Sequence, residues 1–165
     1  MNQNLEISGD FDVFFAREFA ATARAAWFVV FDADLAGEIA QEAFCRAFGR
    51  WRQVSKYDRP GAWVRTVAVR LAVRRRHRQR LEVELTDMAA GIHNDPDRPD
   101  DVLETALRSL PRQQRAAVVL RYLCDLDIDS VAAALQCRPA TARVHLHRAR
   151  AALGDLLGVR DNDLA

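Results

Sequence analysis

Arginines that lack acidic neighbours are the residues of this sequence best suited to binding chemistry. Residues 59–80 hold eight arginines and no acid, and residues 138–150 hold four arginines, two histidines and no acid. The planar guanidinium fork pairs well with phosphates and with the edge of guanine. Between the two blocks, residues 81–101 hold seven acids and one arginine. We therefore predict two anion-binding surfaces separated by a solvated acidic spacer.

The residue types that usually carry catalysis form no recognisable constellation. There is no G-x-S-x-G, no phosphate-binding glycine loop and no zinc-ligand spacing. His145 and His147 are two positions apart on an expected helix, so their rings diverge and cannot easily share a metal. His93 lies beside Asp95 and Asp97 in an expected linker, where a preorganised site is not expected. We predict a binding protein with no catalytic residue, metal or cofactor.

The cysteines and the hydropathy pattern indicate a cytoplasmic protein. Cys45, Cys124 and Cys137 are odd in number, widely spaced and without a C-x-x-C motif, which favours reduced, buried thiols. A redox-sensing pair of Cys124 and Cys137 stays an alternative. Residues 1–10 are polar and acidic, unlike a signal peptide. The longest apolar run, residues 25–31, is too short to cross a membrane, so no membrane contact is expected.

Apolar residues at spacings of three and four predict three helices that would position the first arginine block. The first covers residues 11–31 with Asp10 as N-cap, and the second begins near Leu35 and includes Trp51 in its buried stripe. The third covers about residues 61–81. Its predicted buried stripe consists of Trp63, Val67, Leu71 and Val73.

The C-terminal third predicts four short helices that include a helix-turn-helix. Asp127 or Asp129 is expected to cap the third of them, and a turn at residues 136–138 separates it from a basic helix that begins at Pro139. Small residues are needed where the two helices cross, and Ala132 and Ala133 provide them. The second helix of such a motif enters the major groove of DNA.

The face of this last helix that lies off its apolar stripe is the predicted DNA surface. Its residues are Arg138, Thr141, Arg143, Val144, His145, Arg148 and Arg150. Helical position places Thr141, Val144, His145 and Arg148 nearest the bases, whereas Arg143 and Arg150 suit phosphates. Four ordinary helices with a solvated arginine face remain the alternative.

A second nucleic-acid surface is predicted on the third helix. Its candidate residues are Trp63, Arg65, Arg70, Arg74, Arg75 and Arg76. Such arginines can follow a DNA backbone, and an aromatic ring beside them can stack on an unpaired base. A core position for Trp63 and a solvated basic end for residues 74–76 are the alternatives.

The second helix has the opposite charge. Glu38, Gln41 and Glu42 lie within about one turn, and the two glutamates stand at i and i+4. We expect these like charges to have no internal partner, which would indicate an external basic partner. An ordinary acidic solvent face is the alternative.

Four segments resemble one family in the right order. Residues 110–122, LPRQQRAAVVLRY, and residues 141–153, TARVHLHRARAAL, resemble the sigma-4 domain of sigma-70 family factors. Residues 35–44 and 60–68 are similar to two helices of the sigma-2 domain. The resemblance implies the extracytoplasmic-function (ECF) subfamily and an all-α fold of two small domains. The implied division is a sigma-2-like domain at 1–84, an acidic flexible linker at 85–101, a sigma-4-like domain at 102–158 and a tail at 159–165.

The resemblance also implies what the domains bind. The acidic helix would dock on core RNA polymerase at the beta-prime coiled coil, the sigma-4-like domain would meet the beta flap, and both would contact promoter DNA. An anti-sigma factor is a candidate partner. Arg70 and Arg74 stand where the family often has Asn and Asp, so the usual minus-ten preference is not expected. Two alternatives are a helix-turn-helix regulator that binds duplex DNA without polymerase, and a module whose arginines bind an acidic protein.

Overall fold

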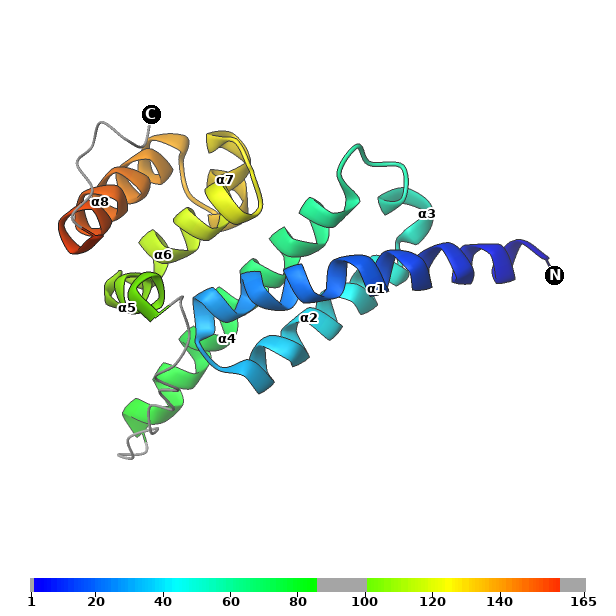
Figure 1. Ribbon diagram of the computed structural model, residues 1–165, viewed down its shortest axis with the longest axis horizontal. Helices are drawn as coiled ribbons and strands as arrows, with labels where there is room; N and C mark the ends of the chain where they lie inside the picture. Colours follow the sequence, from blue (N-terminus) through cyan, green and yellow to red (C-terminus); the bar gives the residue numbers. More distant parts are fainter. Residues whose placement is uncertain (1, 86–100, 158–165) are drawn as a thin grey trace.

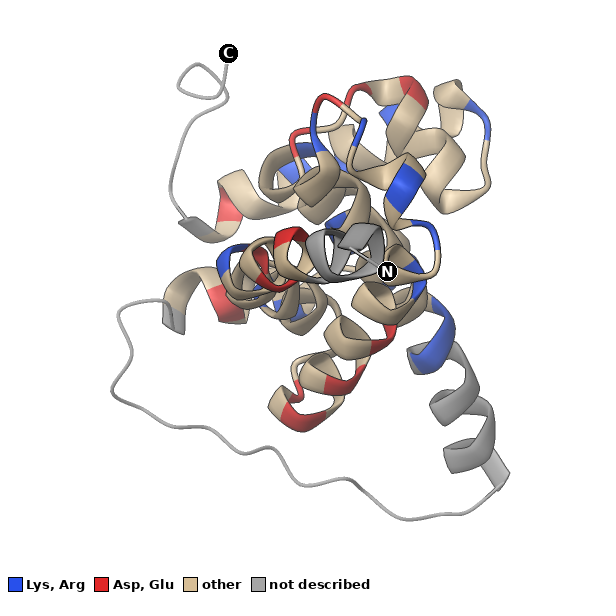
Figure 2. Cartoon of the chain, turned by 90° about the vertical axis from the view of Figure 1, so that its right-hand side faces the viewer, with Lys and Arg blue, Asp and Glu red and all other residues tan. Residues whose placement is uncertain are grey.

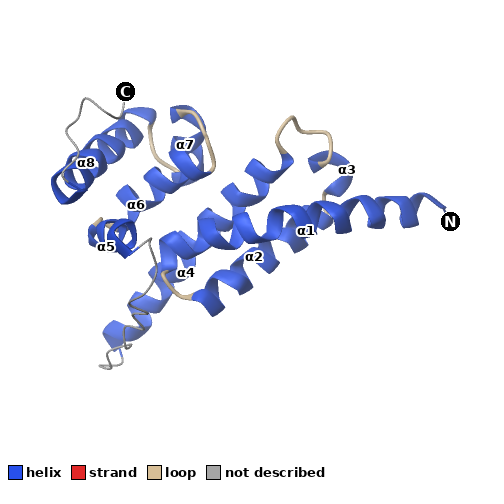
Figure 3. Ribbon diagram, viewed as in Figure 1, coloured by secondary structure: helices blue, strands red, loops and turns tan. Residues whose placement is uncertain are grey.

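In a computed structural model, the chain folds into two helical units that pack against each other (Figures 1 and 3). The structure describes residues 2–85 and 101–157, and it describes side chains from 9 to 75 and from 102 to 156. Within these ranges the regular structure is all helical and no strand is present. The expected linker, residues 85–101, and the expected tail lie almost wholly outside the described residues.

The elements follow one another in this order: α1 (Asn2–Val30), α2 (Ala33–Phe48), α3 (Trp51–Val54), α4 (Pro60–Leu85), α5 (Asp101–Ser109), α6 (Arg112–Val118), the π-helical turn η1 (Val119–Leu123), α7 (Ile128–Leu135) and α8 (Pro139–Leu157). Helices α1, α2 and α4 pack on one another as the N-terminal unit, and α5 to α8 form the C-terminal unit (Figure 1).

Aromatic rings hold the outer end of the N-terminal unit together. Phe11 and Phe14 of α1 lie 5.1 and 4.8 Å, between ring centroids, from Trp51. Phe44 of α2 lies 5.7 Å from Phe14. Offset and edge-to-face rings at these separations stabilise a core beyond the area that they bury. Three elements, α1, α2 and α3, are thereby joined around one cluster.

The structure corrects three helix boundaries that periodicity predicted. Helix α1 begins at Asn2, so Asp10 is an internal helical residue and not its N-cap. Trp51 begins α3 after α2 has ended at Phe48. Its ring still joins the expected core, because a spacing of three or four reports burial and does not require an unbroken helix. Helix α4 continues to Leu85.

The buried stripe of α4 is also rotated from the predicted one. Val64 and Ala68 are fully buried and Leu71 nearly so, whereas Trp63 and Val67 are only half-buried. A long run of apolar residues allows neighbouring stripes, and packing against α1 and α2 decides between them. Trp63 therefore packs against the core with one part of its ring and leaves another part exposed.

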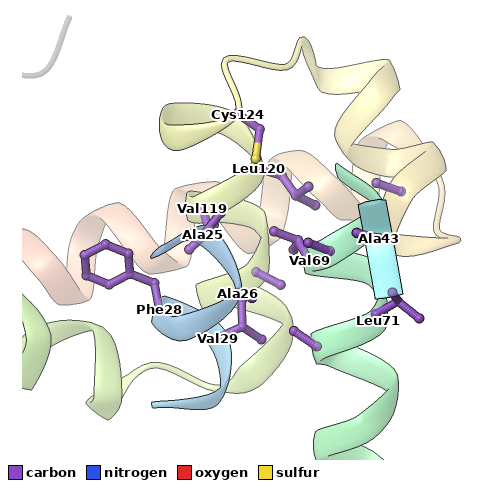
Figure 4. Packing of buried hydrophobic residues seen from close by; sticks show 14 of the residues in the cluster. Ala25, Ala26, Phe28, Val29, Ala43, Val69, Leu71, Val119, Leu120 and Cys124 are labelled. Carbon is purple, nitrogen blue, oxygen red and sulfur yellow. The ribbon is translucent and has the colours of Figure 1, made fainter. Parts of the chain in front are cut away.

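The two units share a continuous apolar core. Figure 4 shows Val119, Leu120 and Cys124 of the C-terminal unit next to Ala25 of α1 and Val69 of α4, and all five are fully buried. Burial of apolar surface is the main favourable contribution to such packing. The two units therefore pack against each other through buried apolar side chains.

Two polar contacts accompany this apolar interface. Phe31, whose φ of 54° ends α1, lies 4.2 Å from the Arg108 guanidinium and 5.0 Å from that of Arg115, measured to its ring centroid. Arg59 forms an ion pair with Asp125 at 2.9 Å. The Phe31 ring thus contacts two cations from the C-terminal unit.

The expectation of buried thiols is correct for one cysteine and wrong for another. Cys124 is buried, Cys137 is half-buried and Cys45 is exposed, and none of them forms a disulfide. The alternative of a redox-sensing pair of Cys124 and Cys137 stays untested.

Candidate DNA and protein interfaces

The acidic face of α2 is positioned by the helix start. The Asp32 carboxylate accepts a hydrogen bond from the Leu35 amide at 2.9 Å, which caps α2. One turn further along, Glu38 and Gln41 are exposed and Glu42 is half-buried. Figure 2 shows acidic residues as red bands along this helix and arginines in blue on the neighbouring part of α4. The acids thus lie on the surface beside an arginine-bearing helix.

The expectation that these acids lack an internal partner is wrong. Arg75 of α4 donates to Glu38 at 3.1 Å and to Glu42 at 2.5 Å. Arg46 donates to the other oxygen of Glu42 at 2.7 Å. The sequence pattern could not reveal this pairing, because Arg75 lies more than thirty positions away and on a different helix.

These contacts alter the ionisation of Glu42. Partial burial raises its pKa, but hydrogen bonds from Arg75 and Arg46 outweigh burial and hold the pKa of the carboxyl below its usual range. Glu42 is therefore an anion at neutral pH. The acidic face carries charge that a basic partner could use.

A groove of about 520 Å³ lies between α4 and the C-terminal end of α2. Its lining residues are Arg46, Gly49, Arg50, Trp63, Thr66, Val67, Arg70, Leu71 and Arg74. The groove thus combines four guanidinium groups with an indole ring and contains no acid. Such a surface can bind a nucleic-acid backbone and stack an unpaired base.

Three of the predicted α4 residues line this groove, namely Trp63, Arg70 and Arg74. Sequence reasoning missed Arg46 and Arg50, which come from the end of α2 and the turn after it. Their spacing of four was a weak signal, because the contact with α4 depends on how the two helices pack. Arg76 lies within α4, but its side chain is outside the described residues.

Arg65 is turned away from the groove, so its prediction as a DNA contact is corrected. Its guanidinium pairs with Glu18 of α1 at 2.7 Å, and both side chains are less than one-fifth exposed. The ion pair tethers α4 to α1, and Arg65 is better described as a structural residue.

The helix-turn-helix forms at the expected place. Asp127 is the N-cap of α7, because its carboxylate accepts from the Ser130 amide at 2.7 Å. Gln136 ends α7 in the left-handed conformation with a φ of 55°, which redirects the chain into α8. Ala132 is buried at the crossing, whereas Ala133 is exposed. Only the first of the two expected small residues therefore serves the crossing.

The inner stripe of α8 is confirmed. Ala142, Leu146 and Ala149 are buried and Leu153 is half-buried. The opposite face carries most of the predicted DNA residues. The exposed ones are Arg138, Thr141, Arg143, Val144 and Arg148.

The other two predicted residues of α8 are less exposed. His145 is half-buried, and its Nδ1 is buried without a hydrogen-bond partner. The Arg150 Nε donates to the Tyr122 hydroxyl at 2.7 Å. Sequence reasoning missed Tyr122, which orients Arg150 from the neighbouring η1.

Neither a metal centre nor a membrane span is visible in the part of the chain that the structure describes. No group of three or more His, Cys, Asp or Glu residues there is arranged to hold a metal ion. None of the helices described combines the length and the apolar character that a bilayer crossing needs.

The fold and these surfaces define a helix-turn-helix protein, and comparison with known proteins specifies its kind. A family model described as "Sigma-70, region 4" matches residues 100–153. The ECF RNA polymerase sigma factor SigE of Mycolicibacterium smegmatis is 33% identical over 145 residues. The match covers 79% of this chain and 54% of SigE, so the chain spans about half the length of that relative.

A second relative is matched over more of its length. The RNA polymerase sigma-E factor of Streptomyces antibioticus is 30% identical over 132 residues, which cover 78% of this chain and 73% of that protein. The chain belongs to the RNA polymerase sigma factors of the sigma-70 family, ECF type.

A solved structure has the same fold. The sigma factor RpoE from Bartonella quintana, in its complex with the anti-sigma factor NepR, matches with a TM-score of 0.72 and 22% identity. The match covers 91% of this chain and 98% of that one. The prediction of an all-α fold made of two helical units is thereby confirmed.

Proposed function

We propose that this chain directs core RNA polymerase to specific promoters as an ECF-type sigma factor acting in the cytoplasm. The observation that carries the proposal is the exposed basic face of α8, on a different unit from the arginine groove beside α4. Two separate nucleic-acid surfaces on one chain suit a protein that engages two promoter elements. Tethering modest binding modules raises their joint affinity through effective concentration.

Each surface has a role in this proposal. Thr141, Val144 and Arg148 of α8, with the half-buried His145, read the minus-thirty-five element in the major groove. Arg143 and Arg150 of α8 contact phosphates, and Arg138, directly before α8, also contacts the DNA. The groove that contains Trp63, Arg70 and Arg74 holds the unpaired strand of the minus-ten element. The supporting observations are the exposure of the first set and the acid-free lining of the second.

The protein partners follow from the acidic face and from the relatives. Glu38, Gln41 and Glu42 dock on the beta-prime coiled coil of core polymerase, and the C-terminal unit meets the beta flap. An anti-sigma factor is a further candidate, because the fold relative RpoE is bound to one. The proposed domain division remains 1–84, 85–101, 102–158 and 159–165.

The test is run-off transcription from genomic DNA fragments by bacterial core polymerase with and without this protein. We expect new, discrete start sites only when the protein is present. A matched control is the Arg143→Ala, Arg148→Ala double variant, which should lose these starts and keep its binding to core polymerase. Absence of new starts, together with specific duplex binding by the protein alone, would instead favour the regulator alternative.

A further inference from the structure

One arginine stands between the two surfaces of the N-terminal unit. Residues advance by about 100° per position around a helix, so Arg74 and Arg75 point in different directions. Arg74 lines the groove proposed for the DNA strand. Arg75 instead reaches across to α2 and bonds to both Glu38 and Glu42. Arg75, which the sequence predicted as a DNA contact, therefore binds the two acids that the sequence predicted as polymerase contacts.

The acids are only partly committed to this contact. Glu38 is 66% exposed, and Glu42 and Arg75 are each about one-third exposed. Ion pairs at this exposure are weak and screened by salt, so a better placed cation can replace one member. Glu42 would keep Arg46 as a partner after such an exchange.

The exchange would leave Arg75 without its acidic partners and beside a strand-binding surface. Its neighbours Arg70 and Arg74 already line the groove. A released guanidinium there would seek an anion, and the backbone phosphates of a bound strand are the nearest candidates in the proposed complex.

We propose that Arg75 is an internal competitor for the polymerase-docking acids, and that docking displaces it toward the DNA strand. This inference rests on the proposed function and adds a coupling to it. A basic surface of core polymerase takes Glu38 and Glu42, and Arg75 then binds a phosphate. Because such coupling is reciprocal, bound DNA would also strengthen the hold on polymerase.

The experiment measures two affinities of the full chain and its Arg75→Gln variant. The first is the Kd for core polymerase, and the second is the Kd of the polymerase complex for a single-stranded non-template promoter oligonucleotide. In Arg75→Gln we expect polymerase binding to be roughly 5-fold tighter and oligonucleotide binding roughly 5-fold weaker, at the low end of measured couplings. Arg52→Gln, which removes one exposed charge from α3, is the matched control and should change neither value.

Salt dependence supplies a readout that a merely structural role would not move. The slope of log affinity for the oligonucleotide against log salt should fall by about 0.7 in Arg75→Gln, as expected for one lost phosphate contact to a single strand. If Arg75→Gln unfolds at a lower temperature, Arg75→Lys should show the same changes at smaller size, because its ammonium holds one acid at a time.

Three outcomes would overturn the inference. Weaker polymerase binding by Arg75→Gln would mean that Arg75 orients the acids and does not compete for them. Unchanged affinities would mean that it does neither. Failure of the unaltered chain to bind core polymerase would contradict the proposed function itself, and this result is distinguishable because it precedes any comparison of variants.

Discussion

Individual arginines of the two basic segments differ in whether an acid of this chain already binds them. Arg70 and Arg74 line an acid-free groove, Arg148 is exposed on α8, and Arg65 is committed to Glu18. All four look alike in the sequence. Each was predicted to contact DNA from its place on a basic helix, and the distinction between them depends on a partner that is distant along the chain.

Arg148→Ala should weaken binding of the polymerase complex to a cognate duplex by about 1–3 kcal/mol, if Arg148 forms a bidentate contact with a base. Arg148→Lys is the control, because it keeps the charge and loses the planar fork. It should retain the salt dependence while relaxing selectivity at one position. The measurement is competition between promoter duplexes that carry single base changes. If the parent chain, Arg148→Ala and Arg148→Lys all bind the promoter duplexes equally well, Arg148 does not contact DNA and is an ordinary solvated residue.

Cys124 makes a prediction about alkaline stability. Burial raises the pKa of its thiol from 9.0 to about 11, partly offset by the charge of Arg65. The unfolded chain therefore loses this proton first. The protonated Cys124 thiol therefore contributes about 2–3 kcal/mol to the free energy of unfolding. This contribution is fully present below pH 9 and is lost as the pH rises from 9 to 11.

Urea unfolding between pH 8 and pH 11 should show this decline in the parent chain and a smaller one in Cys124→Ala. The difference between the two curves is the informative quantity, because other groups titrate in both proteins. Parallel curves over the whole range would contradict the assigned burial of the thiol.

At the scale of the elements, local signals located the helix-turn-helix well. The Asp127 cap, the turn at residues 136–138 and the Pro139 start all depend on residues near one another in the sequence. The N-terminal helices were less predictable. The start of α1, the break before Trp51 and the rotation of α4 depend on long apolar segments that fit several registers.

Substitution of Gly61 tests how tightly α4 packs on α1, and substitution of Gly37 in α2 serves as the comparison. A methyl group at Gly61 would lie 2.3 Å from a Glu18 carboxylate oxygen that Arg65 holds in place. Gly61→Ala should therefore lower the free energy of unfolding by about 1–3 kcal/mol. A methyl group at Gly37, within α2, would meet nothing within 4 Å.

Gly37→Ala is the matched control, and it should raise the free energy of unfolding by up to about 1 kcal/mol through helix propensity. Chemical denaturation of both variants measures the two effects. The packing argument predicts opposite signs, so destabilisation of equal size by the two substitutions would refute it.

At the scale of the whole molecule, the contact between units was the largest unpredicted feature. The sequence suggested two domains on a linker, and the structure adds a shared apolar core and contacts of the Arg108 and Arg115 guanidinium groups with the Phe31 ring. Cys124 lies at this interface, so its thiol can report on the packing of the two units.

Phe31→Ala should lower the free energy of unfolding by about 1–3 kcal/mol and expose Cys124 more often. The measurement is alkylation of Cys124 in a Cys45→Ser, Cys137→Ser background under native conditions. Phe48→Ala is the control, because Phe48 is an exposed aromatic that packs on Phe11 within the N-terminal unit. Faster alkylation should appear only in Phe31→Ala. Equal alkylation rates in the two variants would mean that Phe31 does not stabilise the contact between the units.

The sequence by itself determined the helical class, the position of the helix-turn-helix and the two arginine-rich segments, because periodicity, caps and charge blocks are local properties. Only the tertiary structure decided which arginines stay available to DNA. The pairings of Arg65 with Glu18 and of Arg75 with Glu38 and Glu42 join helices that are far apart in sequence. Ion pairing depends on distance in space, which a one-dimensional charge pattern does not contain.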